Sequence, residues 1–154
     1  MKRARVELLQ SMPIFGGISR ETLEFLIDLA SLHHLEAKEY FFHEGDEAAS
    51  MFVIERGRVV VSKRWNGRPH PIRHLGQGDC FGEMALLDLY PRSASVIAEE
   101  PCDAIELGQD MLLKLFQHDL EQFAILQMNV GREISRRLRT ADDQLFKARF
   151  SSKH

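Results

Sequence analysis

The sequence is poor in cysteine, and neither sign of charge is in large excess. Cys80 and Cys102 are the only cysteines among 154 residues. They lack C-x-x-C spacing, so neither a disulfide framework nor a cysteine-based zinc site is indicated. The formal net charge is −3. A small negative charge gives no general prediction of binding to nucleic acids or membranes.

Long apolar runs are also absent. No stretch approaches the roughly 18 residues that cross a bilayer as a helix, and residues 1–10, MKRARVELLQ, lack the apolar centre of a secretory signal. We therefore expect a cytoplasmic protein without a membrane segment. The chain has 154 residues, 44% of them hydrophobic, which is enough for one core but too short for two ordinary domains. We predict a single domain over residues 1–154.

The first part of this domain, residues 1–31, has helical signals. An apolar cluster at residues 6–9 predicts a short helix. Ser19 can cap a second helix that runs to about Leu32.

The pattern changes to short strands over residues 32–108. Apolar runs of about 4–8 residues are separated by glycines, which is typical of an antiparallel sandwich or barrel. Asn66 and Gly67 together predict a tight hairpin between a strand at residues 59–65 and the next strand. Composition alone does not choose among the barrel types.

Helical periodicity returns over residues 109–149. One short helix is expected at residues 109–117 and a long one from about residue 119 to 149. The long helix carries an apolar stripe that consists of Leu120, Phe123, Leu126, Val130, Ile134, Leu138, Ala141 and Leu145. The stripe either packs on the barrel or pairs with a second copy of the chain. We favour a homodimer through this helix.

The segment FGEMALLDLYPRSASV, residues 81–96, has the chemistry of an anion site. Gly82 opens a short helical stretch at residues 83–87, whose first N–H groups have no intrahelical partner. Arg92 carries a permanent planar charge that can hold two phosphate oxygens. The Glu83 carboxylate suits a ribose hydroxyl. The alternative is a surface ion pair between the two, worth about 0–1 kcal/mol.

This segment resembles the phosphate-binding cassette of cyclic-nucleotide-binding domains. The family includes the catabolite activator protein, kinase regulatory subunits and cyclic-nucleotide-gated channels. Its pattern, F-G-E-(L/M)-A-L, a loop, then (P)-R-(S/A/T)-A-(S/T)-V, is met at every position. The resemblance implies a mainly β protein, an antiparallel jelly-roll barrel with N-terminal helices and a long C-terminal helix. It also implies a ligand site at Gly82, Glu83, Met84, Ala85, Arg92, Ser93 and Ala94.

The ligand that the resemblance implies is a cyclic mononucleotide. We expect cAMP, although Ser93 after the cassette arginine leaves cGMP open. No cofactor and no catalysis are expected. The long helix would signal by moving over the base, with Arg136, Arg137 and Leu138 as possible lid residues. The downstream protein is not indicated.

DNA binding is not expected from this chain. Transcription factors of the family place a helix-turn-helix after the long helix, but only FSSKH follows Arg149. The chain could also be a regulatory fragment of a larger protein.

Two other classes of function remain open. A metal-dependent cupin-like enzyme would use histidines, and the chain has seven. However, it has no His-x-His pair, and His33 and His34 would point to opposite faces of a strand. We therefore expect no metal and surface histidines that are solvated or hydrogen-bonded. A degenerate interaction module without ligand binding is the other alternative, and intact Glu83 and Arg92 speak against it.

Overall fold

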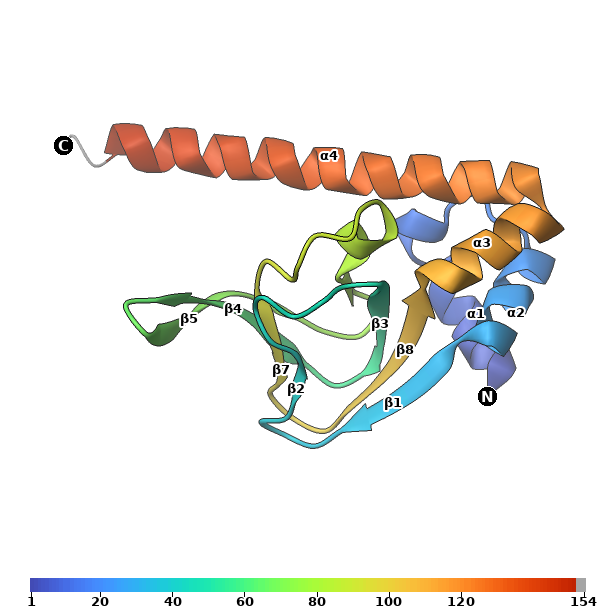
Figure 1. Cartoon of the computed structure of the whole chain (residues 1–154), viewed down its shortest axis with the longest axis horizontal. Coiled ribbons are helices and arrows are strands. Elements are labelled where there is room, and N and C mark those ends of the chain that lie inside the picture. Colours follow the sequence, from blue (N-terminus) through green and yellow to red (C-terminus); the bar gives the residue numbers. More distant parts are fainter. Residues whose placement is uncertain (152–154) are drawn as a thin grey trace.

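The computed structural model describes residues 1–151, with helices at both ends of the chain and two sheets between them (Figure 1). Residues 152–154, the end of the predicted domain, lie outside the described part. The helices are α1 (Lys2–Gln10), α2 (Arg20–Leu29), α3 (Gln109–His118) and α4 (Leu120–Ser151), with short 3₁₀ turns η1 (Pro13–Phe15) and η2 (Glu83–Leu86). The strands are β1 (Ser31–Leu35), β2 (Tyr40–Phe42), β3 (Ser50–Arg56), β4 (Val59–Trp65), β5 (Arg68–Leu75), β6 (Cys80–Phe81), β7 (Ser95–Ala98) and β8 (Cys102–Gly108).

The strands form two four-stranded antiparallel sheets. One has the order β1-β8-β3-β6 and the other β2-β7-β4-β5. The predicted mainly antiparallel β architecture with flanking helices is therefore confirmed. Strand pairing does not join the two sheets to each other in the described part of the chain, so closure into a jelly-roll barrel stays a prediction.

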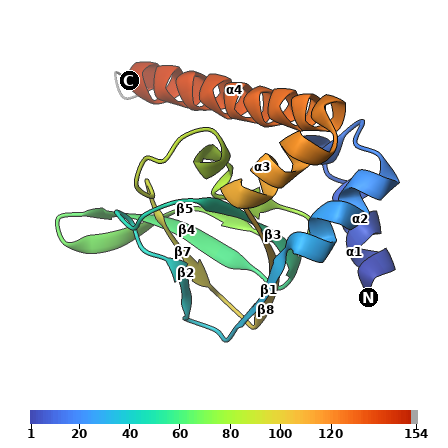
Figure 2. The same cartoon turned by 45° about the vertical axis from the view of Figure 1, so that its right-hand side comes forward.

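Two apolar clusters hold these layers together. The first lies between the sheets, where residues such as Phe52, Val61 and Phe81 meet. The second packs the helices against the sheet that contains β3 and β8, through residues such as Leu26 and Ile105. Figures 1 and 2 accordingly place α1, α2 and α3 together at the same end of the sheets.

The start of the sheet corrects one predicted boundary. The Ser19 hydroxyl accepts a hydrogen bond from the Thr22 N–H at 3.2 Å, as expected for a cap. However, α2 ends at Leu29 and does not reach Leu32. Residues 31–35 pair instead with β8. The ladder satisfies their backbone groups, and this tertiary pairing outweighs the local helical pattern.

The predicted hairpin at Asn66 and Gly67 is confirmed. Trp65 pairs with Arg68, and the two turn residues have φ values of 54° and 75°. Positive φ at both central positions is the geometry of a type I′ turn, which Asn-Gly favours. The hairpin of β4 and β5 extends away from the sheets (Figure 1).

Helix α4 is packed only along its first part. Its buried residues are Leu126, Asn129 and Val130, and the Asn129 amide donates to the Gly16 carbonyl at 2.7 Å. Farther along, Leu138 and Leu145 are 62% and 68% exposed. The second half of the predicted apolar stripe thus faces solvent, where α4 runs on above the β4–β5 hairpin (Figure 1). No helix of the described residues combines the length and apolar character that a bilayer crossing needs.

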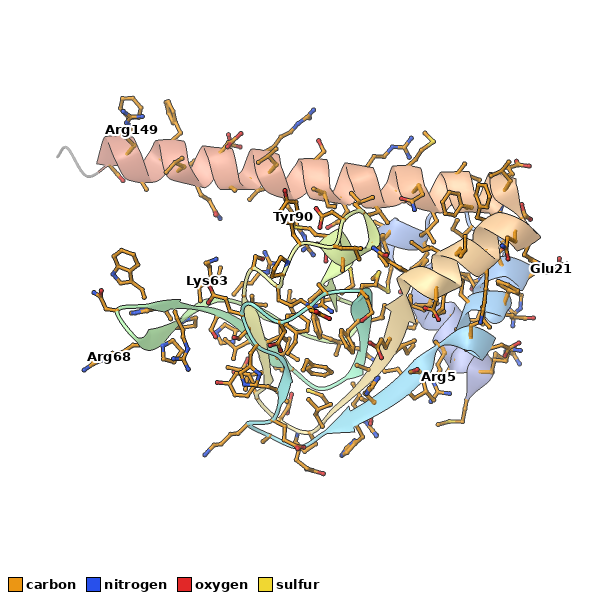
Figure 3. All side chains as sticks on the ribbon, in the orientation of Figure 1. Arg5, Glu21, Lys63, Arg68, Tyr90 and Arg149 are labelled. Carbon is orange, nitrogen blue, oxygen red and sulfur yellow. The ribbon has the colours of Figure 1, made fainter. Side chains whose placement is uncertain are left out.

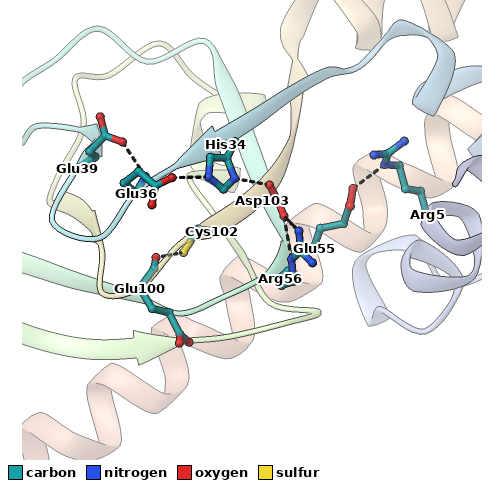
Figure 4. Close-up of polar contacts among 9 residues, drawn as sticks. All are labelled: Arg5, His34, Glu36, Glu39, Glu55, Arg56, Glu100, Cys102 and Asp103. Atoms are coloured by element: carbon teal, nitrogen blue, oxygen red, sulfur yellow. Dashed lines mark hydrogen bonds and ion pairs between the residues drawn. The ribbon is translucent and has the colours of Figure 1, made fainter.

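Several histidines are hydrogen-bonded to surface carboxylates, as expected. His34 contacts Asp103 at 2.7 Å and Glu36 at 2.9 Å, and Arg56 also donates to Asp103 (Figure 4). The hydrogen bond to Asp103, followed by that to Glu36, raises the pKa of His34. A further ion pair joins Arg5 of α1 to a carboxylate on β3 (Figure 4). The Arg5 ion pair ties the N-terminal helix to the sheet.

Candidate functional site

A cavity of about 190 Å³ lies between the segment 81–94, strands β4, β5 and β7, and helix α4. Every cassette residue predicted for the site is among its lining residues: Gly82, Glu83, Met84, Ala85, Arg92, Ser93 and Ala94. The structure therefore brings both ends of the cassette to one place.

Arg92 is held in this cavity by backbone contacts. Its N–H donates to the Asp46 carbonyl, and its carbonyl accepts from the Gly45 N–H, both at 2.8 Å. The side chain is only 9% exposed, and its guanidinium lies 3.9 Å from the centre of the Phe42 ring. Burial lowers the pKa of Arg92, while the charges of Glu106 and Asp46 oppose that shift. A guanidinium has so high a pKa that it stays charged here.

Gly82 makes room for this guanidinium. Its φ is +80°, and a Cβ at this position would lie 2.6 Å from Nη1 of Arg92 and 3.2 Å from the Ser50 carbonyl oxygen. Glycine is therefore required here by both its backbone conformation and its missing side chain.

We predict that Gly82→Ala destabilises the fold more than Gly45→Ala. Both glycines have positive φ, which costs a non-glycine residue about 1–2 kcal/mol. No atom lies within 4 Å of a Cβ at Gly45, whereas one at Gly82 must displace Arg92. Urea unfolding followed by circular dichroism would give the two free energies. Equal losses for both variants would contradict the close contact with Arg92.

Glu83 is the second buried charge of the cavity. It is 1% exposed, its Oε1 accepts a hydrogen bond from Arg137 of α4, and its Oε2 has no partner among the described residues. Arg137 also donates to the Cys80 carbonyl at 3.3 Å. Burial, followed by the charge of Glu83, raises the pKa of the Cys80 thiol to about 12. This cysteine is a buried packing residue.

A second contact links the helices to the cassette. Gln109, the first residue of α3, donates from its side-chain amide to the Ala85 carbonyl. Helices α3 and α4 therefore contact the cassette through Gln109 and Arg137.

Arg73 on β5 also lines the cavity, and the sequence did not reveal it. Counting outward from the hairpin turn would place Ile72 opposite Val61. An irregularity in β5 shifts the register, so that Arg73 pairs with Val61 instead. Desolvation and then the charge of Arg137 lower the pKa of Arg73. Predicting Arg73 as a lining residue from the sequence would have required the position of the bulge in β5.

The charges around the cavity favour an anion. Arg73, Arg92 and Arg137 outnumber the two carboxylates, Glu83 and Asp88. Clefts lined by an excess of one charge concentrate ligands of the other.

The remaining site predictions are placed as follows. Of the three lid candidates, only Arg137 lines the cavity. Arg136 forms an exposed ion pair with Glu133 at 2.8 Å, and Leu138 faces solvent. Ser95 accepts the Glu44 N–H at 2.8 Å, a structural contact. Within residues 1–151, no cluster of three or more His, Cys, Asp or Glu residues could hold a metal ion.

Known proteins resemble this chain in sequence and in architecture. The sequence model of the family described as "cyclic nucleotide-binding domain" matches residues 32–119. A cAMP-dependent protein kinase regulatory subunit of Eremothecium gossypii is 33% identical over 123 residues, which cover 80% of this chain and 26% of the relative. The cyclic AMP receptor protein of Thermus thermophilus is 27% identical, over 89% of this chain and 62% of the relative. The chain thus spans less than two thirds of either relative.

Solved structures agree with these matches. A cyclic nucleotide-binding domain from Methylobacillus flagellatus superposes with a TM-score of 0.82 at 25% identity, covering 94% of this chain and 82% of that one. The family match includes both sheets from β1 to β8 and the whole cassette, from Gly82 to Arg92. The chain therefore belongs to the cyclic nucleotide-binding domain family.

Proposed function

We propose that this chain is a receptor for cAMP, which it binds in the cavity without chemical change. The observation that carries the proposal is the pair of buried, oppositely charged groups that face one cavity. Oε2 of Glu83 and Nε of Arg92 have no hydrogen-bond partner among the described residues. Buried polar atoms are normally satisfied, so such atoms call for a ligand or a functional reason.

A 3′,5′-cyclic nucleotide matches these two groups. Its phosphodiester carries one negative charge, which the Arg92 guanidinium can hold through two oxygens. Its free 2′-hydroxyl can donate to the Glu83 carboxylate, which acts only as an acceptor. Ser93 and Ala94 follow Arg92 along the same wall. The phosphate would lie between Arg92 and the backbone of residues 83–87.

Titration calorimetry with cAMP tests the proposal directly. We expect saturable one-to-one binding, and chromatography of the released nucleotide should return it unchanged. An absence of heat and of thermal stabilisation at saturating cAMP would overturn the receptor function. Hydrolysis of the nucleotide would overturn only the claim that no chemistry occurs.

We propose that α4 transmits the signal. The cavity of about 190 Å³ is smaller than the roughly 300–1,000 Å³ of typical small-molecule sites. Arg137 extends into it from α4 and contacts Glu83. A ligand that needs this space and this carboxylate favours an arrangement in which Arg137 has moved. It can shift α4 only by its difference in affinity for the two arrangements.

We also propose a homodimer through α4. Its second half exposes Leu138 and Leu145, at a spacing that suits a helix–helix seam. Sedimentation of the chain should give the dimer mass, and a monomer mass at tens of micromolar would remove this proposal. We further propose that the two sheets are the halves of a jelly roll and that residues 1–154 act as one domain.

A second candidate ligand is cGMP, and Arg73 is the observation that favours it. Arginine can donate two hydrogen bonds to O6 and N7 of guanine, and adenine offers no equivalent pair of acceptors. Arg73 lines the cavity, and its side chain makes no hydrogen bond or ion pair with any described residue. It is therefore available to a base.

We predict that Arg73→Ala weakens cGMP binding more than cAMP binding. A bidentate contact to guanine is worth about 1–3 kcal/mol of discrimination, or roughly 5–150-fold. Calorimetry with both nucleotides gives the ratio for each protein. Arg68→Ala, on the same strand but outside the cavity lining, is the control. If Arg73→Ala leaves the ratio unchanged, Arg73 does not read the base, and tighter cGMP binding by the unaltered chain would overturn cAMP as the ligand.

A further inference from the structure

The tip of the β4–β5 hairpin exposes an aromatic residue among cations. Trp65, the only tryptophan of the chain, is 71% exposed, and Ile72 is 52% exposed. Arg64 and Arg68 flank Trp65 in sequence and are also exposed. The side chains of Arg64, Trp65 and Arg68 form no hydrogen bond, ion pair or ring contact with the rest of the described chain. Figure 3 shows Lys63 and Arg68 on the hairpin where it leaves the sheets.

The charge of the hairpin is opposite to that of the whole chain. No Asp or Glu occurs between Glu55 and Asp79, although the chain has 23 acidic residues. The hairpin itself carries Lys63, Arg64, Arg68 and Arg73. Since the whole chain has a net charge of −3, this concentration of cations is local. The partner of this surface should be acidic.

The backbone of the hairpin indicates how a partner would be held. Strand β5 is the edge of its sheet, but Pro69 and Pro71 lie in it and lack an N–H. An added strand would therefore find missing donors along this edge. Recognition must come from side chains. Trp and Arg are the residue types that most often dominate the energy of protein interfaces, and the type I′ turn holds them without a loop to be ordered.

The number of free cations decides between classes of partner. Lys63 is near Glu44, at 3.7 Å, and His74 is paired with Glu99. Arg64 and Arg68 remain at the tip. A protein that follows a phosphate backbone derives its affinity from many such contacts, for example about 6–10, and the hairpin tip supplies only two free cations among the described residues. A protein hot spot needs only a few residues.

The end of α4, through which we propose that two copies pair, does not provide the acidic surface. The exposed end of α4 is apolar, but its two acids, Asp142 and Asp143, lie among Arg139, Lys147 and Arg149. That helix end is not acidic. Pairing of two copies through α4 therefore leaves the hairpin tip open to a different protein.

We propose that the tip of the β4–β5 hairpin, residues 64–68, is a docking site for an acidic protein surface with an apolar pocket that receives Trp65. The root of the hairpin touches the cassette, since Lys63 donates to the Ser93 carbonyl at 2.6 Å. Docking therefore takes place next to the ligand cavity. Binding of a partner at residues 64–68 does not require a nucleotide in the cavity.

A displayed library of random peptides tests this site with the whole chain, immobilised in the absence of nucleotide. The same library is passed over the Trp65→Ala/Arg68→Ala double variant as counter-selection. We expect the enriched peptides to carry Asp and Glu around an apolar residue. When a synthesised peptide is bound, the fluorescence emission of Trp65 should shift to the blue, and this signal is specific because no other tryptophan exists.

Single variants refine the test. Arg68→Ala should reduce the affinity for the selected peptide by about fivefold or more, which is the effect of losing an interface residue worth over 1 kcal/mol. Arg20→Ala on α2 should leave it unchanged. Enrichment without acidic bias, or equal enrichment on the double variant, overturns the proposal. A blue shift seen only with phosphatidylserine vesicles or only with a single-stranded oligonucleotide also overturns it, in favour of a membrane or nucleic-acid site.

Discussion

Arg92→Ala should reduce the affinity for cAMP by at least about 30-fold and up to several thousand-fold. The truncation removes the only cation that the cassette itself supplies to the cavity, from a position that is 9% exposed. Loss of one partner from a buried, hydrogen-bonded charge pair costs about 2–5 kcal/mol, which gives this range. Most of this free-energy cost arises because the bound phosphate loses its hydrogen bonds to water and finds no guanidinium to replace them. Calorimetry with cAMP measures the change.

Thermal unfolding provides an independent measurement for Arg92→Ala. A ligand present at about 100 times its dissociation constant stabilises the native protein by about 2.7 kcal/mol. The unaltered chain should show this gain with cAMP, and the variant should show almost none. Arg92→Lys should recover little, because an ammonium cannot hold two phosphate oxygens in one plane.

Arg20→Ala is the matched control for Arg92→Ala. Arg20 is an exposed cation of α2 whose only recorded partner among the described residues is Glu24, in an i,i+4 pair at 3.2 Å. Its removal changes the net charge by the same amount, so it reports the general electrostatic effect. If Arg92→Ala retained full affinity, the phosphate could not lie at this guanidinium, and the proposed position of the ligand would be wrong.

The cassette could be predicted because its residues are local in sequence. Gly82, Glu83 and Arg92 lie within eleven positions, and each has a backbone or charge requirement that few other residues meet. The Asn66–Gly67 turn is equally local. In both cases short-range chemistry determines the local geometry: the turn residues have positive φ, and the predicted cassette residues line one cavity. Ligand binding at these residues stays a proposal.

Other features depend on contacts that no local pattern contains. The residues at 31–35 are a strand only because β8 pairs with them. Arg73 faces the cavity only because a bulge shifts β5 by one residue. For the lid, three adjacent residues of one helix were candidates from the sequence. The choice of Arg137 among them depends on how α4 crosses η2, which is a tertiary property.

Arg137→Ala should destabilise the protein by about 2–3 kcal/mol in the absence of ligand. The change leaves Glu83, which is 1% exposed, without its only cationic partner among the described residues. Breaking a fully buried pair in this way costs about 3–5 kcal/mol, and the lower value here allows for the 31% exposure of the Arg137 side chain. Urea unfolding followed by circular dichroism would give the free energy.

Repeating Arg137→Ala in a Glu83→Gln variant separates the loss of the charge interaction from the loss of side-chain packing. In Glu83→Gln, position 83 has no charge, so a further Arg137→Ala change should cost less than about 1 kcal/mol, in line with ordinary surface changes. Arg136→Ala is the control on the same helix, because its pair with Glu133 is 60% exposed on the arginine side. The free energy of unfolding of Arg136→Ala should lie within about 0.5 kcal/mol of that of the unaltered chain.

Together, Arg137→Ala, Glu83→Gln and the double variant form a double-mutant cycle, which also tests whether α4 can transmit a signal. If Arg137 stabilises the fold through Glu83, a ligand that binds this carboxylate changes the free energy that holds α4 in place. The coupling between Arg137 and Glu83 is then an upper limit on what the ligand can transmit by this route. If Arg137→Ala costs the same free energy with and without the Glu83 charge, the contact between Arg137 and Glu83 has no coupling energy. Signalling through the helices would then need another contact. The structural candidate is the hydrogen bond from the Gln109 side chain to the Ala85 carbonyl.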